Sequence, residues 1–376
     1  MKILFIVSHG LSESSGISKK IRDQVKALTN LGIDTHLSFL KLDKSNHFSK
    51  RMINTEVLEE YKSILNIHKY LKWRFSYKSI IEYLLVNDIK NVYIRYTHFC
   101  NPAFLKFLHQ LKKRQIKIFL EIPTYPYDLE YKNTNLKTRF FKKIEEISRK
   151  HLHKYVDFII TFSNLKYIFG IRTISVNNGV DLNNIKIKSL RIEKETLNLI
   201  AVASMDFWHG YERIIEGMKN YYDYENAYIV NFHLVGNPNS AESQKYKHLV
   251  EKYDLGNYVR FHGYKTGKPL DNLFDTANLA IGCLGVHRKG IDRIKSLKNR
   301  EYCARGIPFI YSETDDQFDN KEFTHKAPSN DSAIDIVSII DFYNKVDKSP
   351  HKIRAFAEKE LSWETQFLKI RDEFQE

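Results

Sequence analysis

Short apolar runs alternate with amphipathic segments along most of the chain. The first set is an apolar run at 2–8, a polar turn, helical spacing of apolar positions over 17–31, and an alternating run at 33–40. Apolar runs bounded by turns predict strands, and apolar positions three or four residues apart predict an amphipathic helix. The order strand, helix, strand predicts a parallel sheet, in which ligands bind at the loops that follow the strands.

The pattern continues through both halves of the chain. It predicts further strands at 91–96, 116–122, 155–161, 174–176, 197–204, 228–235, 259–262, 279–284 and 308–311. Helices are expected at 102–114, 211–221, 240–253, 270–277 and 352–374, the last with Trp363 in its middle. A polar, charged stretch at 181–196 separates the halves. We therefore expect two α/β domains, 1–185 and 190–354, because the chain is too long for one ordinary core.

The composition is that of a globular protein rather than a membrane-spanning one. Of the 376 residues 43% are hydrophobic, and no apolar run reaches the length of about eighteen residues that spans a bilayer. The apolar run after Met1 is expected to be a strand rather than a signal peptide, because no cleavable small-residue site follows it. Cys100, Cys283 and Cys303 lack metal-ligand spacing and cannot all pair, which fits a reduced cytoplasm.

The formal charge of +14 calls for an anionic partner or surface. No nucleic-acid-binding module is evident, so we expect no nucleic-acid partner. Two segments, 69–78 and 136–154, interleave cations with aromatic and aliphatic residues. Such segments lie on anionic bilayers, but they also occur as helices that cover their own domain while lysines reach into solvent. Both interpretations stay open, and the confinement of both segments to the first half is not what nucleic-acid binding predicts.

The stretch 296–309, with the sequence S-L-K-N-R-E-Y-C-A-R-G-I-P-F, has the signals of a short helix. Ser296 suits the start, and Gly306 with Pro308 suits the end. Lys298 and Glu301 are three residues apart and so share a face, where they suit a phosphate and a sugar hydroxyl. The alternative is an ordinary surface ion pair.

Two loops of the second half suit phosphate binding. In F-W-H-G-Y at 207–211, His209 before Gly210 suits a diphosphate, whereas Phe207 and Trp208 are expected to form a buried aromatic cluster. In G-V-H-R-K-G at 285–290, Arg288 and Lys289 stand between glycines, an arrangement that binds phosphates or is simply solvated.

Three loops of the first half are further candidates. Gly16 lies at the mouth of the first helix, where the loop suits an anion or sugar hydroxyl, or is only a tight turn and a cap; the G-x-G-x-x-G spacing is missing. At the end of the strand at 116–122 and just after it lie one acid and several aromatic or hydroxyl side chains that suit carbohydrate, or a rigid turn: Glu121, Thr124, Tyr125 and Tyr127. At the end of the strand at 91–96, Arg95 or His98 suits an acceptor, although a lone histidine is often structural.

With these residues in view, the chain resembles the retaining GT-B glycosyltransferases of family 4 over nearly its whole length. The similarity is carried by the first strand with its Gly16 loop, N-G-V-D at 178–181, W-H-G at 208–210 and E-Y-C-A-R-G-I-P at 301–308, which matches the family's E-A-M-A-x-G-x-P pattern. F-W-H-G-Y, H-R-K-G and L-K-x-R-E-Y are similar to the bacterial polysaccharide-assembly branch.

The resemblance implies two Rossmann-like domains facing a cleft, with the helix at 355–376 crossing back to the first domain. The first domain would bind the acceptor and the second the nucleotide-sugar. Glu301 would hold the ribose hydroxyls, and His209 takes the place of the family's diphosphate-binding lysine. Two departures stand out: Arg293 occupies the position of an expected acid, and Ser204 lies near the place of an expected arginine.

These considerations give a function and its residues. We expect a retaining, metal-independent glycosyltransferase that moves a hexose from a nucleotide diphosphate, expected to be UDP, to a lipid-linked or polysaccharide acceptor. No cofactor is expected, and the enzyme would lie in the cytoplasm on the inner face of the membrane. Expected donor contacts are Gly16, His209, Gly210, Arg288, Lys289, Lys298 and Glu301; acceptor contacts are Arg95, Thr124, Tyr125 and Tyr127; and transfer-step residues are Glu121, His98, Arg288 and Lys289. The alternatives are a nucleotide-sugar epimerase of the same fold and a non-enzymatic basic membrane-binding protein.

Overall fold

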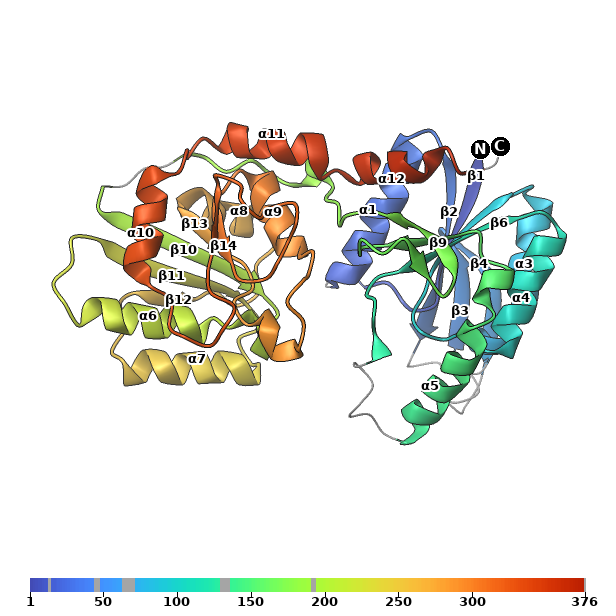
Figure 1. Cartoon of the computed structure of the whole chain (residues 1–376), viewed down its shortest axis with the longest axis horizontal. Coiled ribbons are helices and arrows are strands. Elements are labelled where there is room, and N and C mark those ends of the chain that lie inside the picture. Colours follow the sequence, from blue (N-terminus) through green and yellow to red (C-terminus); the bar gives the residue numbers. More distant parts are fainter. Residues whose placement is uncertain (13–14, 44–47, 63–71, 129–135, 191–193, 375–376) are drawn as a thin grey trace. The chain divides into compact units, whose positions relative to one another are not determined.

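The chain forms two compact units, each built on its own sheet (Figure 1). The computed structural model describes residues 1–12, 15–43, 48–62, 72–128, 136–190 and 194–374. Unit 1 comprises Met1–Asn177 and Trp363–Glu376, and unit 2 comprises Asn178–Ser362. The chain therefore leaves unit 1, forms all of unit 2, and returns to complete unit 1.

The described part of unit 1 contains a nine-stranded sheet in the order β4-β3-β2-β1-β5-β6-β7-β9-β8. Its strands are β1 (Lys2–Val7), β2 (Asp34–Asp43), β3 (Phe48–Ile53), β4 (Glu56–Lys62), β5 (Asn91–Arg95), β6 (Lys117–Ile122), β7 (Phe158–Thr161), β8 (Tyr167–Ile168) and β9 (Ile171–Ser175). Its helices are α1 (Gly16–Asn30), α3 (Lys78–Val86), α4 (Pro102–Lys113), α5 (Leu136–Arg149) and α12 (Trp363–Arg371). The run from β2 to β9 is parallel, as predicted, whereas β3, β4 and β8 pair antiparallel.

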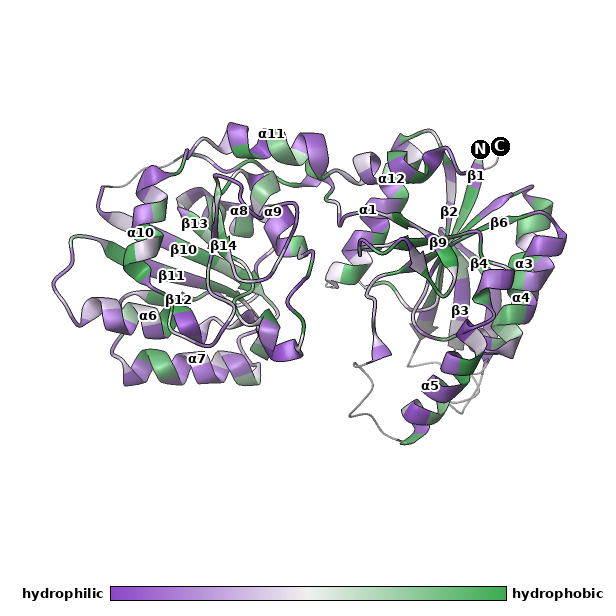
Figure 2. Cartoon of the chain, viewed as in Figure 1, coloured by the Kyte–Doolittle hydropathy of each residue, from purple (hydrophilic) through white to green (hydrophobic). Residues whose placement is uncertain are grey.

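Helices cover both faces of this sheet. Successive residues of each strand point to opposite sides, and both sides of the strands are apolar and need to be buried. Leu4 and Ile6 of β1 pack in a cluster with the apolar side chains of α3 and α4. Ile3 and Phe5 pack in another cluster with α1 and α12. Strands buried on both faces are continuously apolar, which is the pattern that a parallel sheet requires. Figure 2 shows hydrophobic residues along the strands of both units.

Unit 2 contains, among its described residues, a six-stranded parallel sheet in the order β12-β11-β10-β13-β14-β15. Its strands are β10 (Thr196–Ala203), β11 (Ile229–Gly236), β12 (Val259–Phe261), β13 (Leu279–Ile281), β14 (Phe309–Tyr311) and β15 (Thr324–Lys326). Its helices are α6 (Glu212–Tyr222), α7 (Ala241–Lys252), α8 (Gly267–Thr276), α9 (Leu297–Arg305), α10 (Ile336–Lys345) and α11 (Pro350–Glu360). Counted within the unit, this strand order is 3-2-1-4-5-6, the order of a Rossmann fold.

Two features of the fold differ from the sequence pattern. The hairpin β3–β4, which extends the unit 1 sheet beyond β2, has no counterpart among the predicted strands. The single helix expected over 352–374 is wrong, because α11 ends at Glu360 and α12 begins at Trp363. Between them Leu361 accepts a backbone hydrogen bond from Val180 at 2.9 Å, and Ser362 pairs with Val180 as in a sheet. At this point the chain around Ser362 is extended and pairs with Val180, so the helix is interrupted.

Candidate functional site

The loops of unit 2 that follow β10 and β13 meet at the centre of its sheet. These neighbouring strands are where the strand order reverses, and ligands bind at such a point in open α/β sheets. The backbone N–H of Leu284 donates to the carbonyl of His209 at 2.9 Å, and that of Gly285 donates to Trp208 at 3.1 Å. Gly210 has a φ of +64°, and a Cβ there would lie 2.9 Å from the nitrogen of Gly285. Glycine is therefore required at 210 for the loops to meet.

His209 is buried at this junction in one defined tautomer. Its Nδ1 accepts the backbone N–H of Asp206 at 2.8 Å, so the proton of the neutral ring lies on Nε2. Burial, reinforced by the charges of Lys298 and Lys289, lowers the pKa of His209 to about 2. The ring is therefore neutral at any physiological pH, and its Nε2–H is a hydrogen-bond donor.

Lys298, in the first turn of α9, reaches the same place. Its Nζ lies 2.7 Å from Nε2 of His209 and 3.7 Å from Sγ of Cys283. An ammonium group only donates hydrogen bonds, so Lys298 and His209 present two donors that face one another. An anionic oxygen beside them would accept from both. Ser296 is the N-cap residue of α9, as predicted, but its side chain makes no capping hydrogen bond.

The two cations of the loop after β13 have different surroundings. Arg288 lies 2.6 Å from Oε1 of Glu212 and 2.7 Å from Oδ1 of Asp331, and it also donates to the carbonyl of Phe207. Its charge is thus balanced by two carboxylates, so the structure argues against the expected diphosphate contact of Arg288. Lys289 is exposed, and its Nζ lies 4.8 Å from the centre of the Trp208 ring.

The expectation that Phe207 and Trp208 form a buried cluster is wrong. Phe207 is exposed and Trp208 is only partly buried. Their rings pack edge to face, with centres 5.0 Å apart. The backbone of this turn is held by the neighbouring loop after β13, so the rings are not needed to fill the core.

Glu301 lies one turn after Lys298 on α9 and has a separate partner. Its Oε1 accepts from Nε and Nη2 of Arg305 at 3.2 and 3.1 Å, and Arg305 also pairs with Asp271. Because Arg305 engages only Oε1, the second oxygen has no side-chain partner in the described part of the chain. The side chain is partly exposed, so Glu301 can still accept hydrogen bonds from hydroxyl groups of a ligand.

Arg293, at the position of the expected acid, is exposed and forms an ion pair with Asp316. The segment around it is extended, because the backbone N–H of Thr314 donates to Asp292 at 2.7 Å and that of Ile294 donates to Thr314 at 3.2 Å.

In unit 1, Glu121 and Arg95 lie in the interior. Glu121 is completely buried and is bound by Arg95, by Gln24 at 2.8 Å and by the hydroxyl of Tyr93 at 2.7 Å. Burial alone would raise the pKa of this carboxyl, but the charges of Arg95 and Lys20 lower it, so it is ionised. A carboxylate and a guanidinium that satisfy one another in the core do not meet a substrate. We therefore correct the expected transfer role of Glu121 and acceptor role of Arg95 to a structural one.

The other acceptor candidates come together at the ends of β5 and β6. The ring of His98 stacks on that of Tyr127 with centres 3.6 Å apart, and Tyr125 packs edge to face on Tyr127 at 6.1 Å. Tyr127 itself is completely buried, so its expected contact with the acceptor is wrong. Thr124 is exposed beside them. Burial, followed by the charge of Lys142, lowers the pKa of His98 to about 4, so the ring is neutral near pH 7.

Gly16 begins α1, and the preceding Ser15 caps that helix by accepting from Ser18 at 3.4 Å. A Cβ at Gly16 would meet nothing within 4 Å, so packing does not require glycine there. Residues 13 and 14 of the loop before Gly16, which is expected to suit an anion or sugar hydroxyl, lie outside the described residues.

Solved structures of glycosyltransferases have a similar arrangement of elements. A glycosyltransferase from Rickettsia africae superposes with a TM-score of 0.65 at 15% identity, covering 99% of this chain and 97% of the other. A sucrose-phosphate synthase from Thermosynechococcus elongatus gives 0.67 at 15%, with coverage of 99% and 97%. HepE of Anabaena in complex with UDP gives 0.61 at 12%, covering 99% of both chains. No protein-family model and no curated protein sequence matches the chain.

The chain has the GT-B fold. This confirms the predicted fold class, and at these identities the likeness concerns the fold alone. In this GT-B chain the described residues contain no group of three or more His, Cys, Asp or Glu placed to hold a metal ion. No described helix is both long and apolar enough to pass through a bilayer.

Some residues of this GT-B structure escaped the sequence reasoning. Glu145 of α5 is completely buried and accepts from the hydroxyls of Tyr96 and Tyr127 at 2.6 and 2.7 Å. It stands in a basic segment that drew attention only for its cations. The one local signal was an acid flanked by cations three residues before and four residues after it, a spacing that makes ion pairs within a helix.

Proposed function

We propose that the chain is a retaining glycosyltransferase, similar to family 4, that transfers a hexose from UDP-hexose to a lipid-linked or polysaccharide acceptor. The observation that carries the proposal is the pair of facing donors, His209 Nε2–H and Lys298 Nζ, where the loops of unit 2 meet. The two donors are only 2.7 Å apart, so an acceptor has to lie beside them rather than between them, and the diphosphate of a nucleotide-sugar supplies anionic oxygens for this. Solved complexes of HepE contain UDP and UDP-glucose, which supports UDP as the nucleotide.

The proposed chemistry follows from the charge that develops on the leaving group. Breaking the sugar–phosphate bond places negative charge on the diphosphate, and donors fixed beforehand stabilise that charge best. Lys298 and His209 would bind the diphosphate directly, with Lys289 nearby. The second carboxylate oxygen of Glu301 would accept hydrogen bonds from the ribose hydroxyls. The acceptor oxygen would bond to the anomeric carbon from the face that the phosphate leaves, and the departing phosphate would take the proton of the acceptor hydroxyl. Attack on that face retains the anomeric configuration and uses no metal or cofactor.

We assign the acceptor to unit 1, at the surface formed by His98, Thr124 and Tyr125, with the buried Tyr127 supporting the ring of His98 from below. The ring of Tyr125, which is partly exposed, suits the apolar side of a sugar ring, and the neutral His98 ring suits a hydroxyl. Arg95, Glu121 and Arg288 are left out of the proposed site because each is satisfied by its own protein partners.

The first prediction separates the contact of Lys298 with the diphosphate from that of Glu301 with the ribose, by calorimetry with UDP and with uridine. Lys298→Met should weaken UDP binding about tenfold to a hundredfold, the value of a lost charged hydrogen bond, and leave uridine binding unchanged. Glu301→Gln should weaken both ligands, because both carry the ribose. Lys345→Met, at an exposed lysine of α10, is the matched control and should bind UDP as the wild type does.

Several results would contradict this assignment. Wild-type protein that binds no UDP-, GDP- or CMP-sugar would overturn the nucleotide-sugar proposal. A Lys298→Met protein with unchanged UDP affinity would remove the proposed diphosphate site. Release of an isomerised sugar in the absence of any acceptor would replace the transferase by an epimerase.

A further inference from the structure

Helix α5 of unit 1 turns a polar face toward its own unit. The side chains of this face are buried and charged or polar: Lys142, Glu145 and Ser148, with Arg149 mostly buried beside them. Glu145 accepts from Tyr96, Tyr127 and, at 2.8 Å, from Lys142. A helix usually buries its apolar stripe, so this orientation is the reverse of the ordinary one.

Ion pairs hold the reversed helix in place. Nζ of Lys142 lies 2.9 Å from Asp128, and Arg149 makes two hydrogen bonds to the same carboxylate at 2.8 and 3.2 Å. Hydrogen bonding from Arg149 lowers the pKa of Asp128 to about 2, so the carboxylate stays ionised. Both cations also lie over the ring of Tyr127, at 4.2 and 5.3 Å. The helix is thus held against unit 1 by polar contacts, and its apolar side chains are not needed for that packing.

Three of those apolar side chains point to solvent, whereas Phe141 and Ile144 are half-buried. Leu136 is 81% exposed, Phe140 64% and Ile147 56%. At spacings of four and seven residues they form one stripe along the helix. Among the described residues, no apolar side chain of α5 belongs to the core clusters of unit 1. A contiguous group of exposed apolar side chains of this kind marks a surface that binds a membrane or another molecule.

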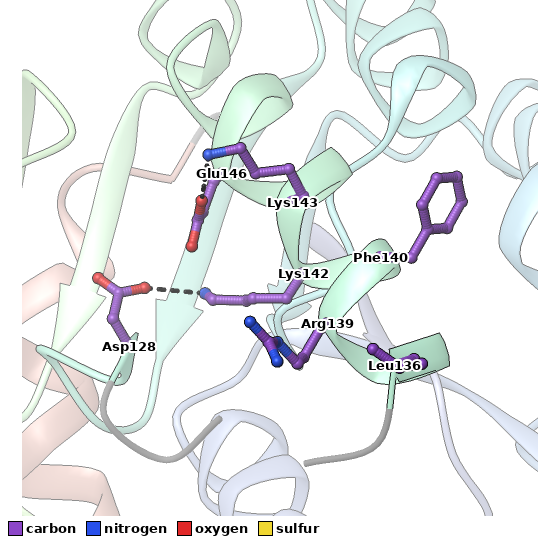
Figure 3. A pocket seen from close by; sticks show the side chains of 7 residues that line it. All are labelled: Asp128, Leu136, Arg139, Phe140, Lys142, Lys143 and Glu146. Carbon is purple, nitrogen blue, oxygen red and sulfur yellow. Dashed lines mark hydrogen bonds and ion pairs between the residues drawn. The ribbon is translucent and has the colours of Figure 1, made fainter. Parts of the chain in front are cut away.

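Cations flank the stripe. Lys137, Arg139, Lys143 and Lys150 are all exposed, and no described carboxylate pairs with Arg139. Beside the first turns of α5 lies an open hollow of about 610 Å³ lined partly by Arg139, Lys142 and Lys143 (Figure 3). Figure 3 shows Arg139 and Lys142 directed toward the side of Asp128 and Phe140 directed away from it. The cations therefore leave the helix on the side of the hollow and Phe140 on another side, so the cations border the apolar stripe.

We propose that the outward face of α5 docks on an anionic lipid bilayer. Leu136, Phe140 and Ile147 enter the boundary between headgroups and acyl chains, and Arg139 and Lys143 bind lipid phosphates. A basic amphipathic helix that lies in the plane of the interface has this combination of groups. The charge of the whole chain, +14, adds attraction to a negative surface.

Other occupants fit the face less well. A second copy would bring the same cations against one another, since a twofold interface pairs a surface with itself. Nucleic acid would use the cations but leave Leu136 and Ile147 of the apolar stripe in water. Lipid docking stands on its own evidence, and only its purpose, access to a lipid-linked acceptor, rests on the proposed function. The other basic segment, 69–78, lies partly outside the described residues and adds nothing here.

The test is flotation of the full chain with phosphatidylcholine vesicles, with and without phosphatidylglycerol. We expect binding to the anionic vesicles only, weakening as salt is raised. Arg139→Gln with Lys143→Gln should reduce binding roughly thirtyfold, and Leu136→Ser with Phe140→Ser and Ile147→Ser by about a hundredfold or more. These side chains are exposed, so the variants should melt as the wild type does.

Matched controls exist in unit 1. Leu85→Ser with Val86→Ser removes an apolar pair of α3 that is 52% and 84% exposed, and Lys106→Gln with Lys113→Gln removes two exposed cations of α4. Both should bind vesicles as the wild type does. Equal binding to neutral and anionic vesicles, no binding, or an unaffected serine variant would overturn the proposal. So would dimerisation lost in that variant or oligonucleotide competition with vesicles. UDP binding, measured separately, reports on the proposed function alone.

Discussion

Glu313, which follows β14, is a carboxyl group completely enclosed by unit 2. Its Oε1 accepts from the amide of Asn299 at 2.9 Å. Its Oε2, and Oδ1 of Asn299, are buried without a hydrogen-bond partner in the described part of the chain. Burial raises the pKa of Glu313 to about 7, because an ionised carboxylate loses its hydration there.

This residue predicts a pH dependence of stability. Between its usual pKa near 4.5 and about 7, Glu313 is protonated in the folded protein and ionised in the unfolded one. The folded state then binds more protons, so its stability falls as the pH rises through this window, by about 3 kcal/mol in all. Glu313→Gln removes the titration and keeps an acceptor for Asn299. Urea denaturation at pH 5 and pH 8 should show the variant gaining about that amount over the wild type at the higher pH.

Parallel pH profiles of the two proteins would show that Glu313 is already ionised, or solvated, in the folded state. Glu322, an exposed glutamate of the same unit, provides the matched control. Its side chain meets water in the folded and the unfolded protein alike, so Glu322→Gln should leave the wild-type profile unchanged.

The sequence indicated individual residues where local order decides their position. His209, Lys298 and Gly210 follow strands or begin a helix, so their place at the sheet edge was predictable. The partners of Arg288 and Glu121 were not, because Glu212, Asp331 and Gln24 come from elements distant in the sequence. Whether a charged side chain meets a ligand or another side chain depends on such pairings.

At the scale of elements, two helix ends offer a comparison. Gly32 follows α1 with a φ of +79°, and Gly306 follows α9 with a φ of +75°. A Cβ at Gly32 would meet nothing within 4 Å, whereas at Gly306 it would lie 2.3 Å from the carbonyl oxygen of Pro350, at the start of α11. The two sites share the backbone conformation and differ only in what is packed against them.

We expect Gly32→Ala to cost about 1 kcal/mol, the strain of a left-handed alanine. Gly306→Ala should cost several times more, because α9 and α11 must also separate. Thermal unfolding of the two variants measures the difference. Equal losses would mean that α11 shifts freely and that the packing of these helices contributes little.

Element types were predictable where periodicity is strong, as in β1, α1 and the strands of unit 2. The hairpin β3–β4 was not, because its residues are largely polar and their pairing depends on the exposed edge of β2. The interruption between α11 and α12 was also hidden, since the local sequence suits helix and only the distant Val180 imposes extended pairing. In α5 the amphipathic pattern was visible in the sequence, but the sequence did not show that the polar face is the one packed against unit 1.

At the scale of the whole molecule, unit 1 is discontinuous in sequence. Trp363, Phe367 and Ile370 of α12 are buried in one cluster with Ile3 and Phe5 of β1. Loss of a single buried large aromatic side chain typically costs about 3–5 kcal/mol. Unit 1 therefore depends on a segment separated from the rest of it by all of unit 2.

A chain ending at Ser362 should have a selectively destabilised unit 1. Hydrogen exchange should show the amides of β1 and β5 losing protection, because the face covered by α12 becomes exposed to water. Amides of β10 and β11 should keep theirs. Uniform loss in both units would show that they unfold as one, and unchanged protection in β1 would show that α12 is dispensable. Trp363→Ala should give the same selectivity to a smaller extent.

The path of the chain also sets an order of events on the ribosome. Residues 178–362 take on the order of ten to forty seconds to translate. During that time the strands of unit 1 have emerged without the side chains of α12 that seal one side of their sheet. Nascent proteins generally complete their N-terminal domain first. Here unit 2 is complete first, and the earliest strands to be synthesised wait longest for burial, as targets for chaperones.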